Sequence, residues 1–305
     1  MDPAHVPAGS IVVGIDGSPS SDKALTWAIE QAALERRALT IVHSLEPLPI
    51  TETGGMYAMS GIDYGRLMED GRAAAQALLA AATARALELD PDLTVHEVLG
   101  HVDPRITLES LGESAAMIVL GSRGRGPVSS LLLGSVGVAV SKRAACPVVV
   151  HRPRSTDAST HGILVGVDGT TDSVPAIDFA YRMASWRVLP LTVLHCYWDG
   201  TPVAPLPGTE MPDDSSEQAV VAESLAGMQE KFPEVEVRVR LVRGFSDQHL
   251  MAASPTCDLL VVGHHPVSAM TDLVRGSVAP AVVEQAHCPV AVVPSPRSLS
   301  GHDGA

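Results

Sequence analysis

The sequence repeats itself once, and this repeat restricts the fold more than any other feature. Residues 11–18, IVVGIDGS, match residues 163–170, ILVGVDGT, and further matches follow in the same order along both halves. A tandem duplication should fold as two similar domains. We expect these domains to span residues 1–152 and 161–297. The matching segments further along the chain are 39–43 with 191–195, 118–121 with 260–263, 134–136 with 276–278, and 146–148 with 288–290.

The offset in residue number between a segment and its match in the second copy is smaller after the second matching pair. The first copy therefore holds extra residues after that pair. We expect this excess in residues 47–65, which are rich in Pro, Gly, Thr and Met, and we interpret that segment as a loop or lid.

Each copy alternates between short apolar runs and stretches with helical spacing. This alternation predicts an α/β fold, with two tandem, doubly wound, five-stranded parallel-sheet domains of Rossmann-like type. In the first helix, Ala24, Leu25, Ala28, Ala32 and Ala33 should form the packed face. The strands expected in the first copy are 11–15, 40–45, 94–99, 116–120 and 147–151, and the helices are 19–33, 64–89, 104–113 and a segment starting at 135.

A glycine-rich loop, GSRGRGPVSSLLLGS, follows the fourth expected strand at residues 121–135. Gly121 and Gly124 permit close backbone approach, and successive N–H groups in such a loop can bind an oxyanion. Gly134 and Ser135 then open a helix whose first N–H groups favour phosphate. This pattern predicts a phosphate site, and the alternative is a loop that needs glycine only to turn.

Asp16 follows the first strand of the first copy, and the glycine loop follows the fourth. In doubly wound sheets, ligands bind beyond the carboxyl ends of the strands where the strand order reverses. If these two strands are neighbours, Asp16 and the loop face one crevice. The Asp16 carboxylate suits ribose hydroxyls or an exocyclic amine. Its alternative role is to cap the following helix, which Ser18 could do instead.

The spacing Gly121-x-x-Gly124, nine residues, Gly134-Ser135 resembles the universal stress protein family, as do Gly-x-Asp-Gly-Ser after strand one and Cys-Pro-Val at strand five. The resemblance covers both copies and implies a fold similar to that of adenine nucleotide alpha hydrolases. It implies ATP as cofactor, with Mg²⁺ held largely by phosphate and water. The implied contacts in the first copy are Gly14, Ile15 and Asp16 near adenine and ribose, the Ser44 backbone at adenine, and Gly121, Ser122, Arg123, Gly124, Gly134, Ser135 and Val136 at the phosphates.

The second copy departs from this pattern. Its matching residues are Asp168, Gly263, Gly276, Ser277 and Val278, but Pro266 stands where the first copy has its second glycine. Proline has no N–H to donate, so one phosphate donor is lost. We therefore expect the first copy to bind ATP, and the second to bind weakly, to bind something else or to remain empty.

Composition excludes several function classes. With 35 acidic and 21 basic residues the net charge is −14, which argues against nucleic-acid binding. We see no secretory signal and no apolar run long enough for membrane insertion, so we expect a cytoplasmic protein with four buried, reduced cysteines. His43 and His195 end strands and are interpreted as core residues rather than catalysts. No metal site is expected from the histidines.

Three functions remain open. The preferred one is a nucleotide-responsive regulatory module, for which the resemblance implies a role in stress or growth arrest. The second is a slow ATP hydrolase, but residues 121–141 contain no Asp or Glu to serve as a general base. The third is a ligand-free interaction scaffold. The resemblance also implies a homodimer of tandem chains, and the expected protein partner is unknown.

Overall fold

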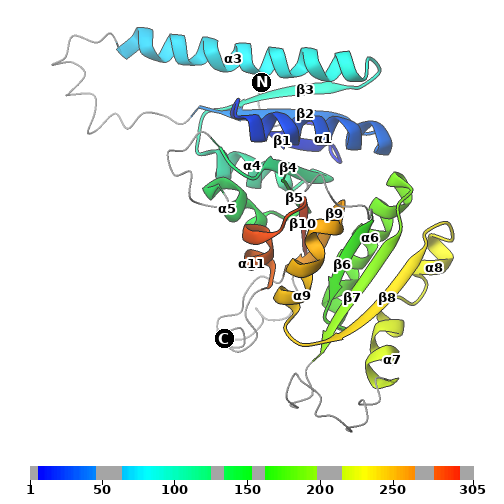
Figure 1. Ribbon diagram of the computed structural model, residues 1–305. Helices are drawn as coiled ribbons and strands as arrows, with labels where there is room; N and C mark the ends of the chain where they lie inside the picture. The colour runs from blue at the N-terminus through cyan, green and yellow to red at the C-terminus, as the bar shows by residue number, and fades with distance from the viewer. Residues whose placement is uncertain are drawn as a thin grey trace, which may run out of the picture. The chain divides into compact units, whose positions relative to one another are not determined.

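The chain forms two compact units, residues 1–152 and 153–305, which we call unit 1 and unit 2. Each is described by itself (Figure 1). The computed structural model describes residues 6–45, 64–124, 134–152, 162–197, 215–264 and 278–295.

Unit 1 contains a five-stranded sheet in the order β3-β2-β1-β4-β5, and every strand pair in it is parallel. The strand order reverses between β1 and β4, as a doubly wound fold requires. The predicted fold class is confirmed. The elements are β1 (Ile11–Gly14), α1 (Pro19–Glu35), β2 (Leu39–Ser44), α3 (Tyr64–Leu89), β3 (Val95–Gly100), α4 (Pro104–Gly112), β4 (Met117–Gly121), α5 (Ser135–Arg143) and β5 (Val148–His151).

Helices cover both faces of this sheet. α1 and α3 pack together on one face, and α4 and α5 pack together on the other (Figure 1). The central strands are consequently apolar on both sides, and Ile11, Val12 and Val13 of β1 have no exposed surface. In α1, Trp27 and Ile29 belong to the buried face, whereas Ala33 is exposed. The prediction that Ala33 lies on the packed face was therefore wrong.

Unit 2 repeats this architecture, with a parallel sheet in the order β8-β7-β6-β9-β10. β6 occupies the place that β1 has in unit 1, and β9 that of β4. The elements are β6 (Ile163–Val167), η2 (Thr171–Ser173), α6 (Val174–Arg187), β7 (Leu191–Tyr197), α7 (Ser215–Ser224), α8 (Met228–Lys231), β8 (Val237–Arg243), α9 (Ser246–Ala253), η3 (Ser254–Thr256), β9 (Leu259–His264), α11 (Val278–Gln285) and β10 (Val290–Pro294).

The extra length of the first copy lies in a helix, so its predicted position within 47–65 was wrong. α3 has 26 residues, whereas α7 and α8 have 10 and 4. The segments before these helices, 46–63 and 198–214, differ little in length and lie outside the described residues, as does the predicted lid. The Ala-rich sequence of α3 continues one helix, whereas Gly227, with φ of 77°, separates α8 from α7.

Three of the four cysteines are buried, and Cys196 is half-buried rather than buried as predicted. All four are free thiols. Burial raises the pKa of Cys146 to about 12 and that of Cys257 to about 11. Because the thiolate is the reactive form, both should be inert in the native protein.

Labelling with a thiol reagent at about pH 8, near the ordinary thiol pKa, should therefore modify Cys196 first. We expect Cys146 and Cys257 to react only after denaturant is added, and mass spectrometry of the labelled peptides measures the order. Rapid labelling of Cys146 in native protein would contradict this.

Candidate functional site

The site in unit 1 begins where β1 and β4 end side by side. Gly14 pairs with Leu120, so the loops that follow both strands leave the sheet at the same edge. A Cβ placed on Gly124 would lie 2.6 Å from Oδ2 of Asp16. The structure thus brings the Asp16 carboxylate beside the glycine loop, as expected for neighbouring strands, and a side chain at position 124 would require that carboxylate to move.

Asp16 is held by a short turn. Its Oδ1 accepts the backbone N–H of Ser18 at 2.9 Å. Ser18 in turn caps α1 by accepting the N–H of Ser21, and its hydroxyl donates to the carbonyl of Arg123 at 3.3 Å. The capping role that was the alternative for Asp16 is therefore filled by Ser18, and the aspartate lies beside the loop.

The two halves of the glycine motif lie next to each other. The N–H of Gly134 donates to the carbonyl of Ser122 at 2.8 Å, although residues 125–133 between them are outside the described part of the chain. Gly134 is the N-cap of α5 and provides no side-chain hydrogen bond to the helix. The positive end of α5 thus begins beside Gly124, with Ser135 exposed and Val136 half-buried in its first turn.

Ser20 also belongs to this site, although the sequence analysis missed it. Its Oγ accepts the backbone N–H of Arg123 at 3.3 Å and lies 3.4 Å from the Oγ of Ser122. A Cβ on Gly121 would come within 2.7 Å of the carbonyl carbon of Ser20. The first turn of α1 therefore packs directly on the loop, and this is why Gly121 has to be glycine.

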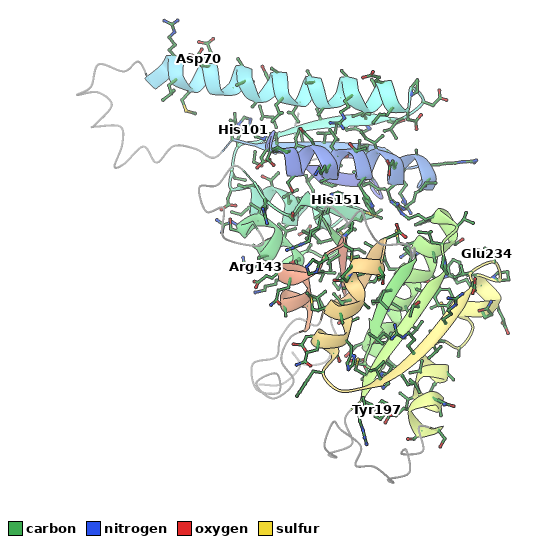
Figure 2. All side chains as sticks on the ribbon, viewed as in Figure 1. Asp70, His101, Arg143, His151, Tyr197 and Glu234 are labelled. Atoms are coloured by element: carbon green, nitrogen blue, oxygen red, sulfur yellow. The ribbon has the colours of Figure 1, made fainter. Side chains whose placement is uncertain are left out.

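The opposite wall of the crevice is built from β1, β2 and α4. Ile15 is buried, and its carbonyl contacts Nδ1 of His43 at 2.8 Å. His43 thus has a hydrogen-bond partner, but it is half-buried rather than a core residue as predicted. Ser44 ends β2, and its hydroxyl donates to Oγ1 of Thr107 at 3.3 Å. In Figure 2, His101 follows β3 at this same edge of the sheet.

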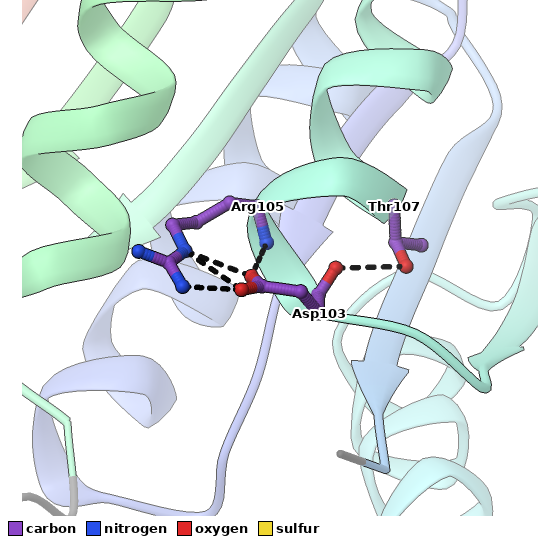
Figure 3. A network of polar contacts seen from close by, with 3 residues as sticks. All are labelled: Asp103, Arg105 and Thr107. Atoms are coloured by element: carbon purple, nitrogen blue, oxygen red, sulfur yellow. Dashed lines mark hydrogen bonds and ion pairs between the residues drawn. The ribbon is translucent and has the colours of Figure 1, made fainter. Parts of the chain in front are cut away.

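Asp103 organises the start of α4 (Figure 3). Its carboxylate accepts the backbone N–H of Arg105 at 2.8 Å and also pairs with the Arg105 guanidinium. The hydroxyl of Thr107 donates to the Asp103 carbonyl at 3.4 Å, which links this cap to Ser44. The hydrogen bond from the Arg105 side chain holds the pKa of Asp103 below its ordinary value.

Replacing Asp103 with asparagine tests this pair, because asparagine keeps the cap but loses the charge. We expect the variant to be less stable by under about 1 kcal/mol near pH 7, since the pair is partly exposed. A lowered folded-state pKa contributes stability above the ordinary carboxyl pKa, and this contribution is lost as the pH falls through the lowered value. Urea unfolding at about pH 7 and pH 3 should show the difference shrinking in acid; an unchanged difference would contradict the assignment.

Unit 2 uses the corresponding residues differently. Oδ1 of Asp168 accepts the N–H and hydroxyl of Thr170 at 2.9 and 2.8 Å, and the hydroxyl of Ser173 at 2.6 Å. Asp172 stands where unit 1 has Ser20. A Cβ on Gly263 would find its nearest atoms only at 3.9 and 4.0 Å, so β9 is less tightly packed against α6 than β4 against α1.

The phosphate half of the predicted second site cannot be placed from the structure. Pro266, Gly276 and Ser277 lie outside the described residues, and Val278 begins α11 without a described side chain. Among the residues that the structure does describe, no group of three or more His, Cys, Asp or Glu side chains is arranged to hold a metal ion.

Comparison with known proteins decides the family. The universal stress protein family profile matches residues 8–152 and 160–294. The chain belongs to the universal stress protein family. A universal stress protein of Mycobacterium tuberculosis is 35% identical over 293 residues, which is 92% of this chain and 96% of that protein. One from Mycolicibacterium smegmatis is 31% identical over 287 residues, covering 93% and 96%.

Solved structures support the fold of this universal stress protein. The crystal structure of a universal stress protein from Archaeoglobus fulgidus matches with a TM-score of 0.68 at 17% identity, covering 95% of this chain and 99% of that one. No helix within the described ranges has the length and apolar character needed to cross a bilayer.

Proposed function

We propose that unit 1 of this universal stress protein binds ATP in the crevice at the ends of β1 and β4. The observation that carries the proposal is the convergence of Asp16, Gly124 and Gly134. A carboxylate, a glycine whose Cβ would meet it at 2.6 Å, and the capping residue of α5 all lie together. The glycine backbone and the helix start suit phosphate, and the carboxylate suits ribose or adenine.

We expect ATP to contact the described residues in a defined order. Gly121, Ser122, Arg123 and Gly124 would contact phosphates, and Gly134, Ser135 and Val136 would close them from the helix side. Gly14, Ile15, Asp16 and the Ser44 backbone would lie along the nucleoside. ATP supplies a triphosphate whose charge the loop can compensate, and Mg²⁺ would be held largely by phosphate and water.

The proposed role is regulatory rather than catalytic. Residues 121–141 carry no carboxylate, and one oxygen of Asp16 already accepts the Ser18 N–H. None of the residues proposed to contact the phosphates therefore carries a carboxylate that could act as a general base. We propose that bound ATP orders the loops, and that a protein partner or a second chain in a cytoplasmic homodimer reads the difference during stress or growth arrest.

Nucleotide content and turnover distinguish this role from its alternatives. The purified chain is denatured, and the released nucleotide is identified by chromatography. A second sample is incubated with Mg²⁺ and excess ATP, and ADP is followed over hours. A regulator should carry ATP and convert little of it, whereas a slow hydrolase should accumulate ADP. A chain with no nucleotide and no thermal shift on adding ATP would be a scaffold, which would refute the proposal.

A further inference from the structure

In unit 2, helix α7 contacts the loop that follows β6 and a histidine on the neighbouring strand β7. Oε2 of Glu217 on α7 lies 3.1 Å from Nε2 of His195 on β7. One turn further on, Cγ1 of Val220 would stand only 2.3 Å from a Cβ on Gly169, the residue after Asp168. Val221 on the same helix is 1% exposed. The helix therefore has a polar contact with β7 and an apolar contact with the loop after β6.

We propose that α7 is a built-in cover of the unit 2 crevice, anchored by Glu217 on His195, and that it takes the place beside β6 and β7 that a ligand would need. The proposal goes beyond ATP binding by unit 1 and does not rest on it. According to this proposal, α7 of the same chain occupies the place in unit 2 where a ligand would bind.

The hydrogen bonds of His195 explain why the anchor is specific. Its ring is nearly buried, with 4% exposure, and Nδ1 contacts the carbonyl of Val167 at 3.0 Å. A carbonyl only accepts, so Nδ1 is the donor there, and Nε2 is left to pair with Glu217. A buried ring nitrogen without a partner is costly, so the carboxylate supplies an interaction that holds α7 in place.

Among the residues that the structure describes, His43 has no hydrogen bond to α3 of the kind that joins His195 to Glu217 on α7. Nδ1 of His43 makes the same kind of contact, at 2.8 Å from the carbonyl oxygen of Ile15, the residue after β1. The first turns of α3, however, remain exposed, with Leu67 at 38% and Met68 at 39% exposure. Asp70, at the free end of α3 in Figure 2, is also exposed. Val220 of α7 is itself 36% exposed, so the two helices differ in the pairing of Glu217 with His195 and not in the exposure of their first turns.

Hydrogen–deuterium exchange of the full chain tests the anchor. In Glu217→Ala, we expect amides of α7 and of residues 168–170 to exchange several-fold to about tenfold faster than in the wild type. Glu223→Ala is the matched control, because it removes the same charge from an exposed position on the same helix. Equal exchange in wild type and Glu217→Ala would overturn the proposal.

A glycine pair tests the apolar contact independently. Gly169 and Gly227 have nearly the same φ, 78° and 77°, so alanine strains both alike. Only at Gly169 does the new Cβ meet α7, whereas nothing lies within 4 Å at Gly227. We expect Gly169→Ala to speed amide exchange in α7 and Gly227→Ala to leave it unchanged. Adding Val220→Ala to Gly169→Ala removes the clashing side chain, so the double variant should regain part of the protection. The cover would be contradicted if both glycine variants speeded exchange in α7 equally and Val220→Ala restored no protection.

Adding ATP to the same samples separates this inference from the proposed function. ATP should protect residues 16–20 and 121–124 and leave residues 168–170 unchanged. Missing protection in unit 1 would count against the ATP proposal alone, and new protection at 168–170 in the wild type would count against the cover alone.

Discussion

Gly124→Pro should abolish ATP binding by unit 1, lowering its affinity by at least about a hundredfold. Proline removes the backbone N–H that the loop would offer to a phosphate, and it fixes φ. Any side chain here also meets Oδ2 of Asp16, because a Cβ would lie 2.6 Å from it. Isothermal titration with ATP and the nucleotide released from purified protein both measure the loss.

Two alanine variants separate the causes of this loss. Gly124→Ala keeps the N–H but not the space, so it should bind more weakly than the wild type and more tightly than Gly124→Pro. Gly71→Ala on α3 is the control, since nothing lies within 4 Å of the Cβ it would add and the residue lies outside the proposed site. Stoichiometric ATP in purified Gly124→Pro would place the nucleotide elsewhere.

The sequence predicted the fold because its signals were local. Apolar runs, a Ser-Pro cap and a repeated order of segments are enough to define a parallel, doubly wound sheet. The convergence of Asp16 and the glycine loop also followed from the sequence, through the rule that ligands bind where strand order reverses. The pairing of Gly14 with Leu120 meets that condition.

The features that were missed depend on contacts between distant segments. Ser20 meets Arg123 across more than a hundred residues, and no local pattern marks it. Glu217 looks like any solvent-facing glutamate until α7 is placed against His195. The extra residues of the first copy were assigned to a loop from composition, but they extend α3, because an Ala-rich stretch continues a helix wherever packing allows it.

The two units therefore differ in more than the proline of the second loop. In unit 2, the aspartate after the first strand also accepts two hydroxyl groups of its own turn, and a carboxylate replaces Ser20. In addition, α7 contacts the loop after β6 and His195. Each change alone disfavours a nucleotide. Together they support our proposals that unit 1 binds ATP and that α7 covers the corresponding place in unit 2.

Ser20→Asp should transfer one of these differences into unit 1 and weaken ATP binding roughly ten- to a hundredfold. Ser20 Oγ lies 3.3 Å from the N–H of Arg123, so a carboxylate at this position would compete for a loop donor and repel the phosphates. The effect should shrink as salt is added, because the repulsion is screened. Titration with ATP at low and high salt measures both.

The neutral variant Ser20→Asn decides whether charge is the cause. It has nearly the size of aspartate, and we expect at most a few-fold loss that salt does not change. The reciprocal Asp172→Ser should not by itself create binding in unit 2, because Asp168 and α7 remain engaged. If Ser20→Asn and Ser20→Asp weaken binding equally, the position acts through its shape, and the difference between the units at this residue is not electrostatic.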